Sequence, residues 1–353
     1  MFRLLQGDVG SGKTIVSLLS ALNTINSGFQ VAVMAPTEIL ARQHFKLARK
    51  IYPKNYKVEL VSGKSESKIK KDILSKLSSH EVDIIFGTHA IFQRKVNFNK
   101  LGLIIIDEQH KFGVNQRKKL SDKGGANCDV LLMTATPIPR TLTMTMYGDM
   151  DISIIREKPK SRKSIKTYSK PESKISDIIK FISKEIKSDN QIFWVCPLIE
   201  ESKKLDHSSA VNKFEYLKRL FPKQVSLVHG KTTPEEKEKV LNDFLENKFK
   251  ILVSTTIIEV GIDFPNATTI VIENANKFGL SQLHQLRGRV GRGDKDSSCI
   301  LMFKKNLREN AKKRINILKK SNDGFVISEE DMKIRGFGDI LGFKQSGMKI
   351  FKL

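Results

Sequence analysis

Residues 2–25 read FRLLQGDVGSGKTIVSLLSALNTI, and this order of apolar, glycine-rich and amphipathic segments decides the fold. Residues 2–6 form an apolar run of strand length, whereas residues 14–26 have the character of a helix. The turn between them, GDVGSGKT at 7–14, matches the pattern GxxxxGK[ST]. A strand, this turn and a helix in that order predict a phosphate-binding loop in an α/β sheet.

The rest of the first half continues the alternation of strands and helices. Its strand-like segments are continuous apolar runs, which are typical of a parallel sheet covered on both faces. The expected strands after 2–6 are 31–36, 57–62, 82–88, 101–107 and 128–136, and the expected helices are 14–26, 39–51, 65–78 and 116–123. This βαβ repetition predicts a doubly wound parallel-sheet domain over residues 1–157.

A charged, proline-containing stretch at 156–167 interrupts the alternation, and we interpret it as a linker. The pattern then resumes and predicts a second α/β domain over 158–305, without a second GxxxxGK[ST] loop. Its expected strands are 191–199, 225–230, 250–256, 268–275 and 297–303, and its expected helices are 173–187, 212–221 and 234–245. Residues 306–353 form a basic, helical and then glycine-rich tail.

Composition restricts the partners. The formal net charge is +24, and an excess of this size favours polyanions, nucleic acid before anionic membranes; a general lysine bias is the alternative. Cys128, Cys196 and Cys299 lack zinc-site spacing and are interpreted as reduced, buried thiols. No signal peptide is recognised, and no apolar run approaches the roughly 20 residues of a membrane-spanning helix. We therefore expect a cytoplasmic protein with no membrane partner and no structural metal.

The glycine-rich turn has a direct chemical interpretation. Its glycines permit close backbone approach and positive φ, so that backbone N–H groups and the helix N-terminus face phosphates. Lys13 is expected to pair with the β- and γ-phosphates, and the Thr14 hydroxyl is expected to hold Mg²⁺. A tight strand–helix turn with an incidental lysine is the alternative. The expected nucleotide-binding residues of this turn are Gly7, Gly10, Ser11, Gly12, Lys13 and Thr14.

A second acidic site follows the apolar strand at 101–106. The carboxyl ends of parallel strands are where such sheets bind ligands, and Asp107 and Glu108 come at such an end. Asp107 is expected to hold Mg²⁺, directly or through water, and Glu108 to orient or deprotonate the attacking water. An ordinary acidic helix start is the alternative. The polar turn TATPIPRT at 134–141 follows the next strand and is expected to couple the site to motion.

Arginines in the second half complete the predicted site. The segment QLRGRVGRG at 285–293 places three arginines among three glycines, and such arginines can stabilise the charge that develops on a γ-phosphate. A solvated or DNA-contacting basic patch is the alternative. The segment STTIIEVGIDFP at 254–265 brings Glu259 and Asp263 to the end of another strand. A nucleoside triphosphate held between two domains would explain both segments.

Seven segments occur in the order of the superfamily 2 helicase motifs, and together they resemble most the RecG family of branched-DNA helicases. The seven segments are GDVGSGKT, APTEILA, GTHAIF, DEQH, TATPIPRT, STTIIEVGID and QLRGRVGRG. The resemblance extends through the tail, DGFVISEEDMKIRGFGDILGFKQSG at 323–347. The transcription-repair coupling factor shares TATPIPRT and the tail pattern, but typically reads DEEQ where this chain has DEQH.

The resemblance implies two tandem RecA-like domains followed by a C-terminal helical hairpin and loop, with ATP and Mg²⁺ as cofactors and DNA as the partner. It assigns ATP-site roles to Lys13, Thr14, Asp107 and Glu108, and makes Arg292 the first choice for an arginine finger. Further members of that site are Gln285, Arg289, Gly261 and Asp263. Residues expected to contact DNA or to couple it to the ATP site are Thr37, Thr88, His89, Gln109, His110, Thr134, Thr136, Arg140, Arg335 and Gln345.

The function that the resemblance implies is an ATP-dependent DNA translocase that acts on branched or duplex DNA, in replication fork regression and Holliday junction processing. We expect a monomeric motor core without the N-terminal wedge domain of the family. One alternative is a weakly active motor fragment that needs a separate wedge-domain subunit. The others are a translocase like the transcription-repair coupling factor and an RNA helicase of the same superfamily.

Overall fold

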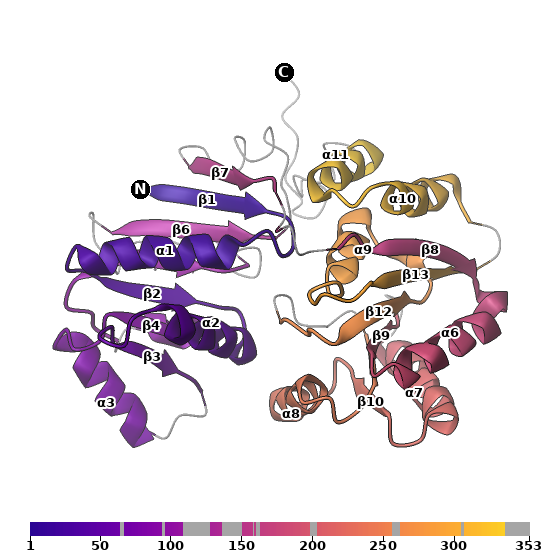
Figure 1. Ribbon diagram of the computed structural model, residues 1–353, viewed down its shortest axis with the longest axis horizontal. Coiled ribbons are helices and arrows are strands. Elements are labelled where there is room, and N and C mark those ends of the chain that lie inside the picture. The colour runs from indigo at the N-terminus through magenta and orange to yellow at the C-terminus, as the bar shows by residue number, and fades with distance from the viewer. Residues whose placement is uncertain are drawn as a thin grey trace. The chain divides into compact units, whose positions relative to one another are not determined.

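The computed structural model describes residues 1–63, 67–93, 96–108, 128–135, 150–157, 159, 163–197, 203–255, 262–304 and 307–335. The chain divides into two compact units, Met1–Pro159 with Glu259–Ile262, and Lys160–Ile258 with Asp263–Leu353. Each unit contains one parallel β-sheet with helices on it (Figure 1). The predicted fold class of two α/β parallel-sheet domains is confirmed.

The first unit has a seven-stranded sheet in which every described strand pair is parallel. The strand order is β3-β4-β2-β5-β6-β1-β7. The strands are β1 (Phe2–Gly7), β2 (Gln30–Met34), β3 (Val58–Val61), β4 (Ile84–Gly87), β5 (Leu101–Ile106), β6 (Asp129–Thr134) and β7 (Asp151–Ile155). The helical segments are α1 (Lys13–Asn26), α2 (Glu38–Ile51), α3 (Ser67–Ser78) and the 3₁₀ turn η1 (His89–Phe92).

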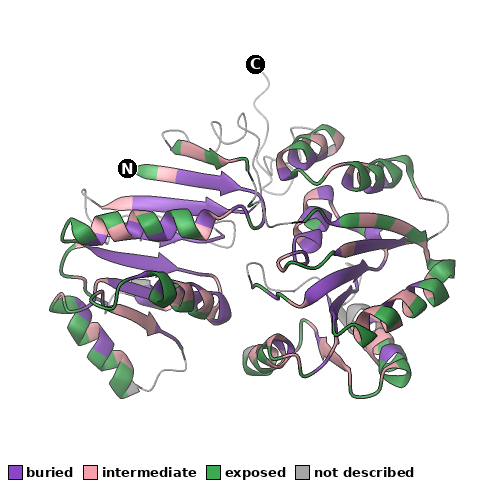
Figure 2. Cartoon of the chain, viewed as in Figure 1, coloured by how far each residue is buried: buried purple, intermediate pink, exposed green. Residues whose placement is uncertain are grey.

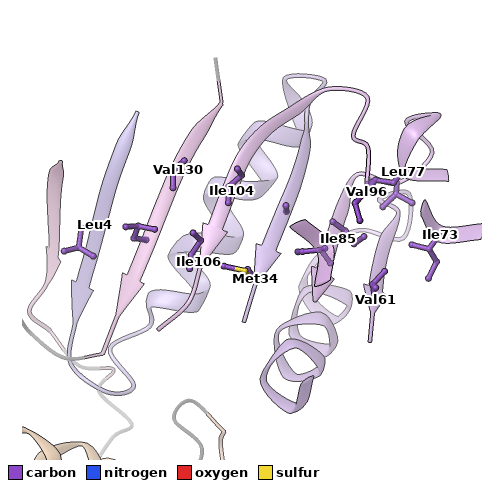
Figure 3. Close-up of a cluster of buried hydrophobic side chains, with 14 of the residues drawn as sticks. Leu4, Met34, Val61, Ile73, Leu77, Ile85, Val96, Ile104, Ile106 and Val130 are labelled. Carbon is purple, nitrogen blue, oxygen red and sulfur yellow. The ribbon is translucent and has the colours of Figure 1, made fainter. Parts of the chain in front are cut away.

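Both faces of this first sheet are buried, which explains the continuous apolar runs of its central strands, such as residues 31–34 and 103–106. Successive strand residues point to opposite faces, so Ile104 and Ile106 of β5 belong to one core cluster and Ile105 to the other. Figure 3 shows the first cluster, in which Leu4, Met34 and Val130 of neighbouring strands join β5. The second cluster packs α1 and α2 against the opposite face. Figure 2 shows the result, with buried central strands and helices that are exposed on their outer faces.

The second unit repeats this topology. Its six-stranded parallel sheet has the order β10-β11-β9-β12-β13-β8, which is the order of the first sheet, less β7, with every strand number raised by seven. The strands are β8 (Lys166–Pro171), β9 (Gln191–Val195), β10 (Val225–Val228), β11 (Ile251–Ser254), β12 (Ala267–Ile272) and β13 (Ser298–Phe303). The helical segments are η3 (Glu172–Lys174), α6 (Ile175–Lys187), α7 (Lys203–Leu220), α8 (Pro234–Leu245), η4 (Ala275–Lys277) and α9 (Leu280–Arg287).

Helices α10 (Glu309–Lys320) and α11 (Gly324–Arg335) form the expected helical hairpin and pack against α9. Polar anchors fix this packing. The Arg287 guanidinium donates to the carbonyls of Leu318 and Ser321 at the end of α10, at 2.6 and 2.9 Å. At the start of α9, the Ser281 hydroxyl donates to Asp331 of α11 at 2.6 Å. The expected glycine-rich loop that follows lies outside the described residues.

The sequence interpretation missed β7 and β8, and it placed the start of β8 inside the linker. Both are edge strands in which exposed and partly buried residues are mixed, so neither contains the continuous apolar run that marks a central strand. Helix α7 begins at Lys203, nine residues before the predicted helix. The expected helix at 116–123 lies outside the described residues. Within the described part of the chain, no helix is long and apolar enough to cross a membrane.

Candidate nucleoside triphosphate site

The glycine-rich turn joins β1 to α1 in a conformation that needs glycine. Gly10 and Gly12 have φ values of 72° and 94°, a region that side chains other than hydrogen rarely allow. At Gly7, a Cβ atom would contact the Lys13 side chain at 3.3 Å and collide with the Ser11 hydroxyl. Each glycine therefore has a steric reason for its position, and the backbone of the turn stays open to a close ligand.

Lys13 lies inside this turn and is 8% exposed. Its ammonium donates to the carbonyls of Gly7 and Asp8, at 2.8 and 2.9 Å. The Asp8 carbonyl also accepts from the Ser11 N–H at 3.1 Å, which closes the turn. Lys13 is the first residue of α1, so its charge lies beside the partial positive charge of a helix N-terminus. Such a combination favours a phosphate ligand.

Asp107 directly follows β5 and is held by three hydrogen bonds. Its N–H donates to the carbonyl of Met34 at 2.9 Å, and its Oδ1 accepts from the N–H of Glu108 at 2.9 Å. Its Oδ2 lies 2.9 Å from Nε2 of His44. Burial alone would raise the pKa of Asp107, but the hydrogen bond and charge of His44 and the charge of Lys13 keep that pKa below its ordinary value. Asp107 is thus a buried, ionised acid.

Glu108 is 4% exposed and has a φ value of 50°. This left-handed conformation is uncommon for a residue other than glycine, asparagine or aspartate, and it costs on the order of 1–3 kcal/mol. Strain of this kind is concentrated at functional sites. The left-handed conformation supports the assignment of Glu108 to the reaction. No pattern in the sequence predicts this conformation.

The sheet brings further predicted residues to the same carboxyl edge. Thr37 follows β2 and begins α2 as its N-cap, with its hydroxyl accepting from the Leu40 N–H at 3.4 Å. Thr88 and the exposed His89 follow β4 at the start of η1. Thr134 ends β6 in register with Gln6 of β1 and is buried. Parallel sheets bind ligands at this edge, and these residues share it with Asp107 and the phosphate-binding turn.

The second unit brings its predicted residues together in the same way. The Arg292 Nε lies 3.8 Å from Asp263 Oδ1, so the segments 285–293 and 262–265 are neighbours. A Cβ atom at Gly293 would contact the Pro265 carbonyl at 2.8 Å, which explains this glycine. Arg289 is 2% exposed, and Gln285 is half-buried on α9.

The residues of the first unit fit Mg²⁺ bound with a nucleotide. The Ser11 hydroxyl is buried and, within the described part of the chain, accepts and donates no hydrogen bond. Thr14 and Asp107 offer hydroxyl and carboxylate oxygens, which are the ligands that Mg²⁺ prefers. Among the residues that the structure describes, no group of three or more His, Cys, Asp or Glu forms a metal cage.

Comparison with known proteins finds similar sequences. The DEAD/DEAH box helicase model matches residues 3–145, and the helicase conserved C-terminal domain model matches residues 173–294. Over the whole chain, the sequence is 50% identical to the ATP-dependent DNA helicase RecG of Bacillus subtilis (strain 168) and 48% identical to that of Streptococcus pneumoniae serotype 4. The chain is similar to RecG along its whole length. It spans about half the length of these RecG relatives, 52% of each.

Solved structures show the same similarity. The structure of RecG bound to a three-way DNA junction is 43% identical and has a TM-score of 0.84; the match covers 99% of this chain and 45% of that one. Dbp5 of S. cerevisiae bound to RNA and ADP BeF3 is 18% identical, with a TM-score of 0.68 over 95% of this chain and 88% of that chain. That likeness shows the fold alone.

Some RecG-family motif residues stay predictions. Gln109, His110, Thr136, Arg140, Gly261 and Gln345 lie outside the described residues, as does the side chain of Arg335. The sequence interpretation also missed two residues. It assigned no role to His44, although a histidine on the buried face of an amphipathic helix is a usable signal. It assigned none to Arg287, whose hydrogen bonds to the carbonyls of Leu318 and Ser321 mark it as a structural arginine among the expected catalytic ones.

Proposed function

We propose that this chain is the motor of an ATP-dependent DNA helicase that moves on branched or duplex DNA. The observation that supports it best is the meeting of Lys13 and Asp107 at one edge of the first sheet. Their charges interact; the Lys13 ammonium donates to the Gly7 carbonyl at the end of β1, and Asp107 Oδ1 accepts from the Glu108 N–H just after β5. Sequence relatives named ATP-dependent DNA helicase RecG support the same activity.

In this proposal each described residue has a definite task. Lys13 and the N–H groups of the turn bind the phosphates, while Thr14 and Asp107 would hold Mg²⁺, which neutralises phosphate charge when bound. Glu108 orients the attacking water and accepts its proton. Arg289 and Arg292 stabilise the charge that develops on the γ-phosphate, with Gln285 and Asp263 positioning them.

We further propose that DNA binds mainly through its phosphates. Thr37, Thr88 and His89 are the proposed backbone contacts in the first unit, and the net charge of +24 supports a polyanion partner. The proposed processes are fork regression and Holliday junction processing, carried out by a monomer in the cytoplasm. The proposed domain limits are 1–157, 158–305 and 306–353.

The test is ATP hydrolysis with and without forked and duplex DNA. We expect stimulation by DNA, loss of activity in Lys13→Ala and Glu108→Gln, and a decrease of about 10³-fold or more in Arg292→Ala. Lys46→Gln, on the exposed face of α2, is the matched control and should retain activity. A wild-type chain that hydrolyses no ATP with any of these DNAs would refute the active motor and favour the weakly active fragment. Full activity in Arg292→Ala would refute the arginine finger.

A further inference from the structure

The acid that is proposed to hold Mg²⁺ has a partner outside the helicase motifs. His44 and Asp107 are 6% and 8% exposed, and 2.9 Å separates Nε2 from Oδ2. An ionised carboxylate only accepts hydrogen bonds, so the Nε2–H of His44 donates. With the Glu108 N–H on Oδ1, each carboxylate oxygen has one described donor. Each oxygen can accept about two hydrogen bonds, so one position on each remains for water or a cation.

Helix α2 is shaped to make this contact. Thr37, Ala41, His44 and Ala48 follow one another at intervals of four, three and four residues, which places them on one face of the helix. Ala41 and Ala48 are 1% and 0% exposed, and such small side chains let the helix lie close to the sheet. His44 is therefore the polar member of a buried stripe. Thr37, two turns or about 10 Å away along the helix, begins it.

The second unit contains the same arrangement without a phosphate loop. Glu273 directly follows β12, as Asp107 follows β5, and its N–H donates to the last residue of β9, Val195, at 2.9 Å. Lys213 belongs to α7, the helix that follows β9, as His44 belongs to the helix that follows β2. Its ammonium contacts the Oε1 of Glu273 at 2.8 Å. Trp194 Nε1–H also donates to Oε1 at 2.9 Å, and the Cys196 thiol lies 3.8 Å from Oε2. Lys213, Trp194 and Cys196 thus contact the Glu273 carboxylate, whereas each oxygen of Asp107 has one described donor and can accept a water or a cation as well.

We propose that His44 is a positioning residue, which fixes the Asp107 carboxylate for the Mg²⁺ of a bound nucleoside triphosphate and links that carboxylate to DNA at the start of α2. The link follows because His44 and Thr37 belong to one rigid helix. A shift of α2 on binding DNA moves the donor that orients Asp107. This inference rests on the proposed function, since it assumes that Asp107 holds the cation.

The test measures metal-dependent binding without turnover. The full chain is titrated with Mg²⁺ in the presence of a fluorescent, non-hydrolysable ATP analogue, and the Mg²⁺ concentration at half-maximal binding is compared between variants. Loss of a hydrogen-bond partner behind a metal ligand typically weakens metal affinity about 10–100-fold. We therefore expect His44→Leu to raise the half-maximal concentration about tenfold or more. His44→Gln, whose amide nitrogen can replace Nε2, should stay within about threefold of wild type.

Controls separate positioning from folding. Lys46→Gln should behave as wild type, and binding of the analogue without Mg²⁺ should be the same in all these variants. Circular dichroism melting checks the fold of each variant. If His44→Leu does not fold, His44→Asn replaces it, because the Asn side chain is one methylene shorter than Gln and its amide does not reach Asp107. Unchanged Mg²⁺ dependence in the non-donor variant, or an equal defect in His44→Gln, would overturn the positioning role.

The DNA link has its own outcome. In the wild type, duplex DNA should lower the half-maximal Mg²⁺ concentration, because coupling between two binding sites is reciprocal. The same DNA-induced shift in His44→Leu would overturn the link. A wild type that binds the analogue with Mg²⁺ but hydrolyses no ATP would refute the proposed function alone, since the Mg²⁺ titration still decides the role of His44.

Discussion

Arg287 allows a sharp prediction, because it separates a structural arginine from the expected catalytic ones of the same motif. We consider Arg287→Met, which keeps an unbranched side chain and removes the guanidinium. Arg287 lies 2.9 Å from Nδ1 of His284 on its own helix, and it also donates to the Leu318 and Ser321 carbonyls. Hydrogen bonds from a charged group contribute about 1.5–3 kcal/mol each, so the two bonds to these carbonyls set the expected effect. Both acceptors end α10, and the arginine is 2% exposed, so water does not replace the lost donor. The expected loss is about 3–6 kcal/mol in the unfolding free energy of the second unit.

A tryptophan makes this loss measurable in one unit. Trp194 is the only tryptophan of the chain; it lies in β9 and is fully buried, so its fluorescence reports the unfolding of the second unit. In a domain of this size each kcal/mol lowers the melting temperature by about 2–4 °C. We therefore expect Arg287→Met to melt roughly 6–24 °C below the wild type.

Arg292→Met is the matched control. Its guanidinium Nε lies at longer distances, 3.4 Å from the Gly288 carbonyl and 3.8 Å from Asp263, so its melting temperature should fall by no more than about 4 °C. Its DNA-stimulated ATP hydrolysis should nevertheless be lost. An Arg287→Met protein that melts within about 2 °C of the wild type would contradict the assigned structural role. So would an Arg292→Met protein that melts as low as Arg287→Met.

Two further predictions are measured by the unfolding signal of Trp194, and a third by the reaction of a cysteine with iodoacetamide. Lys213→Met leaves the buried Glu273 carboxylate without its cation and should destabilise the second unit by about 3 kcal/mol, whereas Lys218→Met on the exposed face of α7 should have little effect. Thr233→Ala removes a capping box at the start of α8 and should cost about 1 kcal/mol. Burial, followed by the charge of Asp129, raises the pKa of Cys128 to about 11, so at pH 8 this thiol should react with iodoacetamide about 100-fold more slowly than in the unfolded chain. Equal rates of alkylation in folded and unfolded protein at pH 8 would contradict this raised pKa. Because the fold favours the neutral thiol, the contribution of Cys128 to stability is complete below the ordinary thiol pKa and decreases as pH rises toward 11.

The sequence predicted what depends on regular patterns. Continuous apolar runs identified the central strands of both sheets, because those strands are buried on both faces. The spacing of GDVGSGKT located the turn before Lys13, because glycine adopts the positive φ values of this turn far more readily than other residues. The acids after β5 were recognisable because parallel sheets bind ligands at the carboxyl ends of their strands.

What the sequence could not predict depends on contacts between distant segments. The edge strands β7 and β8 are only partly buried, so their hydrophobic signal is weak. His44 and Asp107 are 63 residues apart, and their hydrogen bond exists only because α2 packs beside β5 in space. The sequence does not distinguish Arg287 from its neighbours in QLRGRVGRG, because its structural role depends on the carbonyls of Leu318 and Ser321, which are more than 30 residues away in the chain. The left-handed Glu108 is set by the fold around it.

Because one strand order recurs in both sheets, each strand of the first sheet except β7 has a counterpart in the second, and the two can be compared within one molecule. Asp107 is followed by the left-handed Glu108, and Glu273 by the left-handed Asn274, so the two acids occupy equivalent places. Only the first copy has the glycine-rich turn; the second has Pro171 and η3 at the corresponding strand end. The two units thus place a similar buried acid beside different loops, and comparing Asp107 with Glu273 measures what a phosphate loop adds to a buried carboxylate.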